Sequence, residues 1–407
     1  MSPRPPFQGP ALFSYGFRPF FAGASVFALL VVPLWLLIWR GELDYAGHFS
    51  SVDWHIHEMI FGYGSAVLAG FLFTAVPNWT GRLPIKGWPL ALLCLVWVLG
   101  RIVLWGFDGI SPVLVLALDG SFLFLVAAMI AREVIAGKNW RNLKVLVPVL
   151  LLAVANVLFH IEVMVSGASD YGRRLGIALL VFLIMLIGGR IIPSFTRNWL
   201  VKERGKDAAL PIAFSRFDAL SLIVGVLALI SWVLAPEAGV SGLLLLLAAV
   251  LHVARLTRWR GLSVLASPLL VMLHVAYFFV PLGVMVSGFA AFGLVEQVAS
   301  VHLLGIGAVG GMTMAVMMRA SLGHTGRALV AGRVLTIGFA LLLLAAMVRI
   351  LGVVIVQLED VGVDLSAGLW TLSFALLCLR LLPWLLVENT ARRSPNPAPG
   401  VVAKAQK

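Results

Sequence analysis

Residues 20–39 read FFAGASVFALLVVPLWLLIW, a run that contains no charged side chain. A helix of about 20 apolar residues is long enough to cross the hydrocarbon core of a bilayer. Arg18 precedes this run, and Arg40 follows it directly, where a secretory signal peptide would carry a small-residue cleavage site. The run therefore predicts a membrane helix that the mature protein retains.

The composition of the whole chain supports the same class of protein. Of its 407 residues, 61% are hydrophobic and 12% are charged, against about 25% charged in a soluble domain. This excludes a water-soluble globule. Cys94 and Cys378 both lie inside apolar runs, which excludes a disulfide framework and a CxxC metal site.

Repeating the search along the chain gives twelve apolar runs separated by short, often Pro- and Gly-containing gaps. The predicted membrane helices cover residues 20–39, 57–77, 88–107, 111–135, 144–166, 174–193, 216–235, 239–255, 263–287, 298–319, 328–350 and 365–388. We predict an all-α polytopic membrane protein with one transmembrane domain over residues 1–392. Residues 393–407, which include three prolines and lack an apolar period, are expected to form a disordered cytoplasmic tail.

The basic residues predict the orientation of these spans. The net charge is +12, and 24 of the 30 lysines and arginines lie at the termini or near the ends where the even-numbered spans finish. Loops enriched in Lys and Arg stay on the cytoplasmic side. We therefore predict a polytopic membrane protein with both termini in the cytoplasm. The basic residues contact the lipid bilayer in this interpretation, and no nucleic-acid partner is expected.

An internal repeat links distant spans. The segments from His57 to Arg82 and from His302 to Arg327 have equal lengths, and each starts a Gly-rich apolar helix and ends on Thr-Gly-Arg. The span at 174–193 fits as a third, weaker copy. The alternative is that such helices resemble one another by composition alone. A real repeat predicts three four-helix units around a pseudo-threefold axis.

Histidines gather in the predicted outer half of the bundle, on the side opposite the cytoplasm. The five expected there are His55, His57, His160, His274 and His302. Ionisable groups inside a membrane are costly unless they are paired or used. A proton relay would need carboxylates deep in the spans, and the acidic residues considered, Glu58, Glu162 and Glu296, lie near the outer ends.

Neutral imidazole binds metals directly, and histidine ligands without Cys thiolates suit haem iron and copper. We predict that His57 and His302 bind a metal, with haem favoured over copper, because they start the two clearest repeat copies at equal depth. His55, His274 and His160 are predicted to complete the site around copper.

Two further features bear on this site. His55 and His57 are two positions apart, so on a helix their side chains point about 200° apart. Either the two histidines bind different metals, or one binds a metal and the other lies in the bent start of the helix. Asp53 is expected to cap that helix start. Arg173 and Arg174 are the only adjacent arginines on the outer side. They are candidates for binding haem propionates. The alternative is that they are exceptions, in a short outer loop, to the rule that Lys and Arg gather on the cytoplasmic side.

Several longer motifs resemble those of the NnrS family of bacterial membrane proteins. The matching stretches are FSYGFRPFF at 13–21, WHIHEM at 54–59, TAVPNWTG at 74–81, GGRIIPSFTRN at 188–198 and RASLGHTGR at 319–327. The resemblance extends over nearly the whole chain. It implies a twelve-helix inner-membrane protein that binds haem and copper and belongs to the response to nitric oxide in denitrifying bacteria and others under nitrosative stress.

Two functions follow. The first is a haem and copper redox protein that acts on, or protects against, nitric oxide or a related small molecule, with a periplasmic electron donor. Whether it is an enzyme stays open; an oxidoreductase acting on a nitrogen oxide is the reaction class considered. The second is a transporter whose histidines bind a substrate or coupling ion at the repeat interface.

Overall fold

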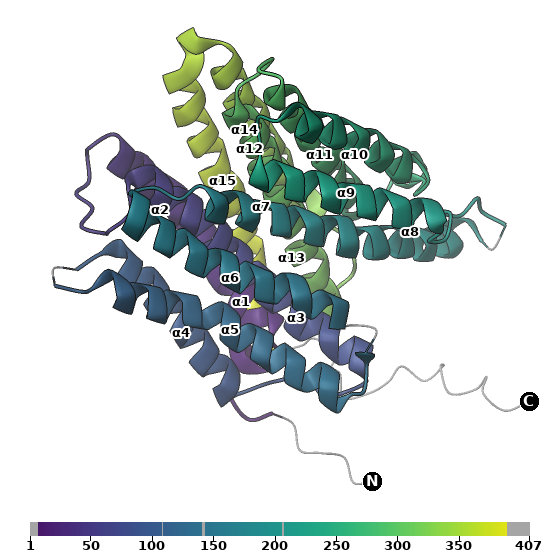
Figure 1. Ribbon diagram of the computed structural model, residues 1–407. Coiled ribbons are helices and arrows are strands. Elements are labelled where there is room, and N and C mark those ends of the chain that lie inside the picture. The colour runs from purple at the N-terminus through teal and green to yellow at the C-terminus, as the bar shows by residue number, and fades with distance from the viewer. Residues whose placement is uncertain (1–6, 108, 141–142, 206, 389–407) are drawn as a thin grey trace, which may run out of the picture.

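The computed structural model describes residues 7–107, 109–140, 143–205 and 207–388. Within these residues it contains twelve helices that are long and apolar enough to cross a membrane, and no strands. The predicted all-α membrane fold is therefore confirmed. Figure 1 shows the helices packed side by side in one bundle, in which the first helix of the chain lies beside the last. The predicted tail at 393–407 lies outside the described residues.

The helices fall into three consecutive groups of four spans. The first group consists of α1 (Phe17–Trp39), the composite span α2 (Ser51–His57), η2 (Glu58–Gly64) and α3 (Ser65–Thr80), then α4 (Trp88–Trp105) and α5 (Pro112–Ala136). The second consists of α6 (Leu143–Ser166), the composite span α7 (Tyr171–Leu183), η4 (Ile184–Gly188) and α8 (Gly189–Arg204), then α9 (Arg216–Leu234) and α10 (Gly239–Thr257). The third consists of α11 (Pro268–Ala291), the composite span α12 (Gln297–His302), η6 (Leu303–Gly310) and α13 (Gly311–His324), then α14 (Gly332–Val354) and α15 (Glu359–Leu386). Three short 3-10 segments, η1 (Ala11–Phe13), η5 (Gly261–Val264) and η7 (Val356–Leu358), lie between or before the spans.

Each composite span contains a stretch of π-helix, namely η2, η4 and η6. A π-helix disturbs the regular ladder of backbone hydrogen bonds, and inside a membrane any freed carbonyl needs another donor. Side chains supply such donors here. The indole of Trp97 donates to the Gly62 carbonyl at 2.9 Å, and Arg255 donates to the Met185 carbonyl at 2.8 Å. Two of the three π stretches, η2 and η4, thus receive a side-chain donor from a neighbouring helix.

The three composite spans occupy the centre of the bundle. In the most apolar part of the first of them, 83% of the residues are buried, against 33% in α4. Around this centre, the last helix of each group packs on the first helix of the next: α5 on α6, α10 on α11, and α15 on α1. The three π-containing spans also contact one another. A threefold arrangement would produce these contacts, and the pseudo-symmetry itself stays a prediction.

Several span boundaries differ from those predicted, for local reasons. The second span begins at Ser51 because Ser50 caps it: the Ser50 hydroxyl accepts from the Asp53 backbone N–H at 3.0 Å and donates to the Asp53 carboxylate at 2.8 Å. Asp53 therefore supports the cap and is not the cap itself. His57 consequently lies in the second turn of the span, where the prediction had it in the first.

The ninth span begins at Pro268, later than predicted, because residues 261–264 form the separate turn η5. His274 therefore lies close to the predicted cytoplasmic end of its helix and not at mid-depth.

Candidate metal centre

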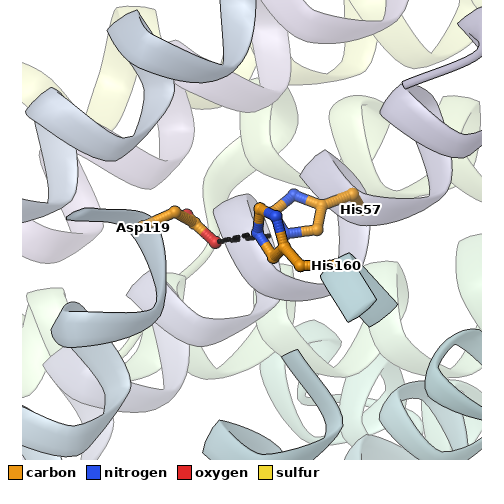
Figure 2. A group of neighbouring side chains, drawn as sticks. All are labelled: His57, Asp119 and His160. Atoms are coloured by element: carbon orange, nitrogen blue, oxygen red, sulfur yellow. Dashed lines mark hydrogen bonds and ion pairs between the residues drawn. The ribbon is translucent and has the colours of Figure 1, made fainter. Parts of the chain in front are cut away.

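The candidate centre is built on three helices near the predicted periplasmic end. The α2 helix supplies His57, α5 supplies Asp119, and α6 supplies Asn156 and His160, which are four residues apart and so share one helix face. All four side chains are buried. Figure 2 shows both imidazole rings close to the Asp119 carboxylate.

The ligand-type atoms of this group converge on one carboxylate oxygen. His57 Nε2 lies 3.2 Å, and His160 Nε2 3.1 Å, from Asp119 Oδ2. Asn156 donates from Nδ2 to the same oxygen at 2.8 Å, and its Oδ1 lies 2.8 Å from His57 Nε2. One atom from each of His57, Asp119 and His160 lies within 4.8 Å of the other two.

A second layer of charged groups fixes the orientation of these ligands. His57 Nδ1 lies 3.2 Å from Glu58 Oε1. Arg101, largely buried on α4, hydrogen-bonds to Asp119 Oδ1 and lies 3.3 Å from Glu58 Oε2. Gly62 makes this possible, because a Cβ at this position would lie 2.4 Å from the Arg101 guanidinium and 2.8 Å from the Glu58 carboxylate. A carboxylate on the far nitrogen of a histidine is typical of metal-ligating imidazoles.

Aromatic rings surround the polar group. Phe49 lies 5.2 Å from the ring of His57 and 5.0 Å from that of His160, measured between centroids. Phe61 and Phe159 also pack against His57, at 5.1 and 5.2 Å. All three phenylalanines are buried. The polar group is therefore enclosed by apolar side chains, where an unpaired charge would be costly.

The geometry suits a metal ion of the imidazole- and carboxylate-binding class. Bonds of about 2.1 Å in a four-coordinate site place the ligand atoms about 3.4 Å apart. The separations of 3.1 and 3.2 Å to Asp119 Oδ2 are near this value. Two imidazoles and a carboxylate suit copper, zinc or iron in the divalent state. A buried His/Asp/His group that could bind a metal is thus present.

Sequence reasoning missed Asp119, Asn156 and Arg101. Asp119 was not among the carboxylates considered, and it lies in the third turn of α5 within an otherwise apolar stretch. The signal was available, because a single acidic residue inside an apolar run marks a functional position by default. The partners of Asp119 could not be found the same way, since they depend on how α4, α5 and α6 pack.

The structure groups the predicted histidines in pairs. His57 meets His160, as described above. His55 lies on another side of α2, where its ring stacks on that of Trp35. It is within range of electrostatic interaction with His302 and Arg349. The contacts of His57 come from α2, η2, α5, α6 and the loop that carries Phe49.

The remaining predicted residues lie outside both pairs. His274 packs beside Gly261 of η5, where a Cβ would lie 2.8 Å from its ring, and its Nδ1 lies 2.9 Å from the Leu270 carbonyl. Arg173 and Arg174 are both paired with Asp170. Arg174 also donates to the Val233 carbonyl at 3.0 Å. These two arginines therefore bind groups of the protein itself.

Comparison with known proteins agrees with the motifs. No protein with a curated description matches the chain. The profile of the family described as NnrS protein matches residues 11–388, which include every helix described above. The chain belongs to the NnrS family.

Proposed function

We propose that this protein is a haem- and copper-binding inner-membrane protein of the bacterial response to nitric oxide, with copper held by His57, Asp119 and His160. The observation that carries the proposal is the convergence of two buried imidazole nitrogens on one carboxylate oxygen. Family membership supports the use of metals. The lysine and arginine distribution supports cytoplasmic termini.

The ligand set fits copper on its own chemistry. In His57, Nδ1 faces Glu58 and Nε2 faces Asn156 and Asp119. Without a metal, His57 Nε2 faces two oxygens and donates to one of them. With a metal bound, the ring proton would lie on Nδ1, toward Glu58, and would leave the Nε2 lone pair for the metal. Without a cation, Asp119 Oδ2 is the common neighbour of the Asn156 amide and two imidazoles. A divalent copper ion would use both imidazoles and the carboxylate, and it would supply nitric oxide binding and one-electron exchange.

The position of the centre suits a neutral gas. Nitric oxide is small and uncharged, so it can reach a buried site from the lipid without a polar channel. The centre lies toward the predicted periplasmic end, so an electron donor on that side would have the shorter distance to it. These two points support a reaction with a nitrogen oxide and leave its products to experiment.

A transporter has less support. A cavity of about 80 Å³ lies between the three central spans, and Gly64, Leu183, Val309 and Thr313 are among its lining residues. None of the five predicted histidines is among them. A substrate in this cavity would therefore not meet the histidines on which the transport hypothesis depended.

The decisive experiment measures metals in the purified protein after expression with copper and a haem precursor. We expect copper, with an electron paramagnetic resonance signal that shows nitrogen coupling. The variants His57→Ala and Asp119→Asn should lose copper. His274→Ala is the matched control, because it removes a buried histidine far from the centre. Full copper in both site variants, with folded protein, would refute the assignment.

A further inference from the structure

A second cluster of polar side chains lies near the same end of the bundle, on another side of α2. It consists of Trp35 on α1, His55 on α2, His302 on α12 and Arg349 on α14. The rings of Trp35 and His55 stack with centroids 4.3 Å apart. The α12 helix, which carries His302, packs on α14, which carries Arg349, and both imidazoles lie within electrostatic range of that guanidinium. Four residues from four helices therefore share one location.

His302 is oriented as a metal ligand would be. Its Nδ1 lies 2.8 Å from the Val298 carbonyl, which can only accept, so Nδ1 carries the proton. The lone pair is then on Nε2, the atom that faces away from the backbone. This arrangement, with one ring nitrogen donating to a backbone carbonyl, is common among ligating histidines.

Space is available beside His302 on its own helix. Gly305 lies about one turn further along, on the same face. No described atom lies within 4 Å of the position that a Cβ at Gly305 would take. By contrast, a Cβ at Gly307 would lie 2.0 Å from the ring of Phe279. The open side of the span is therefore the one that carries His302.

The same cluster holds hydrogen-bonding groups without partners. Among the described residues, Trp35 Nε1, His55 Nδ1 and Arg349 Nη1 are buried atoms with no hydrogen-bond partner. Glu359 lies close enough for its charge to act on Arg349, but it accepts no hydrogen bond from Nη1. Leaving a buried donor unsatisfied is costly. Two N–H donors of this kind call for an acceptor such as a carboxylate.

We propose that this cluster is the haem site, with His302 as an iron ligand, His55 as the second histidine at the iron, and Arg349 bound to a haem carboxylate. Haem combines the features that the cluster requires: a metal for Nε2, a flat apolar ring for the space beside Gly305, and carboxylates for Arg349. The inference rests on the proposed use of haem by this protein. It separates the haem from the centre at Asp119, so His55 and His57 serve different metals.

The test compares four variants purified after expression with copper and a haem precursor. In His302→Ala we expect loss of the Soret band and at least a tenfold lower haem content by pyridine haemochrome, with copper unchanged. In His55→Ala the spectrum should shift to that of a five-coordinate iron. In Arg349→Gln haem should bind more weakly. In His160→Ala haem should be retained and copper lost.

Two controls distinguish the loss of a haem ligand from the loss of folding. Each variant is checked by gel filtration in detergent, and His302→Gly is titrated with free imidazole, which should restore the Soret band. A folded His302→Ala protein with full haem and an unchanged spectrum would overturn the proposal. So would a wild-type protein that contains copper but takes up no haem, and that result would leave the centre at Asp119 intact. Haem uptake without copper would instead refute that centre and support this one.

Discussion

Two buried ion-pair networks lie at opposite ends of this bundle, and each contains histidine, aspartate and arginine. Near the predicted cytoplasmic end, Arg255 donates to Asp218 at 3.2 Å and to the Tyr277 hydroxyl at 3.1 Å. His252 there lies 2.8 Å from the same hydroxyl and 3.2 Å from the Ser221 carbonyl. Near the predicted periplasmic end, two imidazoles and Asn156 surround one oxygen of Asp119.

The difference between the networks is that two imidazoles share one carboxylate oxygen in only one of them. Each ring nitrogen of His252 meets a hydroxyl or a backbone oxygen, so that histidine is satisfied by the protein. The Nε2 atoms of His57 and His160 meet at a carboxylate oxygen, which is how ligands to one metal are arranged. Burial and residue type alone therefore do not identify a site. Convergence of several metal-ligand side chains on one point does.

The largest effect is expected at the cytoplasmic network. Arg255 is fully buried, and it donates hydrogen bonds to the Asp218 carboxylate and to the backbone carbonyl of Met185 in η4. Replacing Arg255 by Ala leaves a buried carboxylate with one fewer partner, which should lower the free energy of unfolding by about 3 to 5 kcal/mol. Thermal unfolding in detergent measures this. Copper content per folded molecule should not change, and a loss of copper would show that the two networks are coupled.

The next effect is at Asp119. The substitution Asp119→Asn keeps the size of the side chain but removes the charge that both imidazoles face. We expect copper affinity to fall by about 100-fold or more, since even residues outside the ligand set contribute 10- to 100-fold. Competition with a chelator of known affinity measures the change. The matched control is Asp218→Asn in the other network, which should leave copper affinity unaltered.

A smaller effect on the metal is expected from Glu58, which contacts the far nitrogen of His57. Glu58→Gln retains a hydrogen-bond acceptor for Nδ1 but removes the negative charge, so copper affinity should fall by about 10- to 100-fold. Glu162→Gln is a suitable control, because Glu162 accepts from backbone N–H groups of residues 170–172 in a nearby loop. Equal losses in both variants would mean that the effect is on folding and not on His57.

The sequence predicted the number and type of helices because each span is an apolar run of sufficient length. It did not locate the helix starts at Ser51 and Pro268, which depend on a serine cap and on a separate short turn. His57 was predicted as a ligand from its place in the repeat, and His160 from depth and side alone. Their meeting point, Asp119, depends on which helices are neighbours, and no pattern within a single helix carries that information.

Two further predictions differ from the structure: the depth of His274 in the membrane and the role of Arg173 and Arg174. His274 was assigned to the middle of a helix that in fact begins five residues later. Arg173 and Arg174 were considered for haem carboxylates, but Asp170, one position before the helix, already binds both. A nearby acidic residue in a short loop is a sufficient reason for such arginines.

The smallest effect is expected at the ion pair of Arg174 and Asp170, which is only partly buried and so contrasts with the two buried networks. The guanidinium of Arg174 hydrogen-bonds to Asp170 and holds the pKa of that carboxyl below its usual range. A lowered pKa in the folded protein stabilises it at pH values above the unfolded pKa of about 3.9. This contribution is lost as the pH falls through the folded-state pKa. The Asp170 side chain is 50% exposed, so solvent screening limits the contribution to about 0.2 to 1 kcal/mol.

Arg174→Gln should therefore lower the unfolding temperature slightly at pH 7 and have a smaller effect near pH 3, where the contribution of the ion pair is being lost. Haem content should stay at the wild-type level, because Arg349 and not Arg174 is assigned to the haem carboxylate. Unfolding curves of the two proteins at both pH values, with haem measured on the same samples, provide the comparison. A haem deficit in Arg174→Gln that exceeds the one in Arg349→Gln would reverse the assignment and place the haem carboxylates at the start of α7 instead.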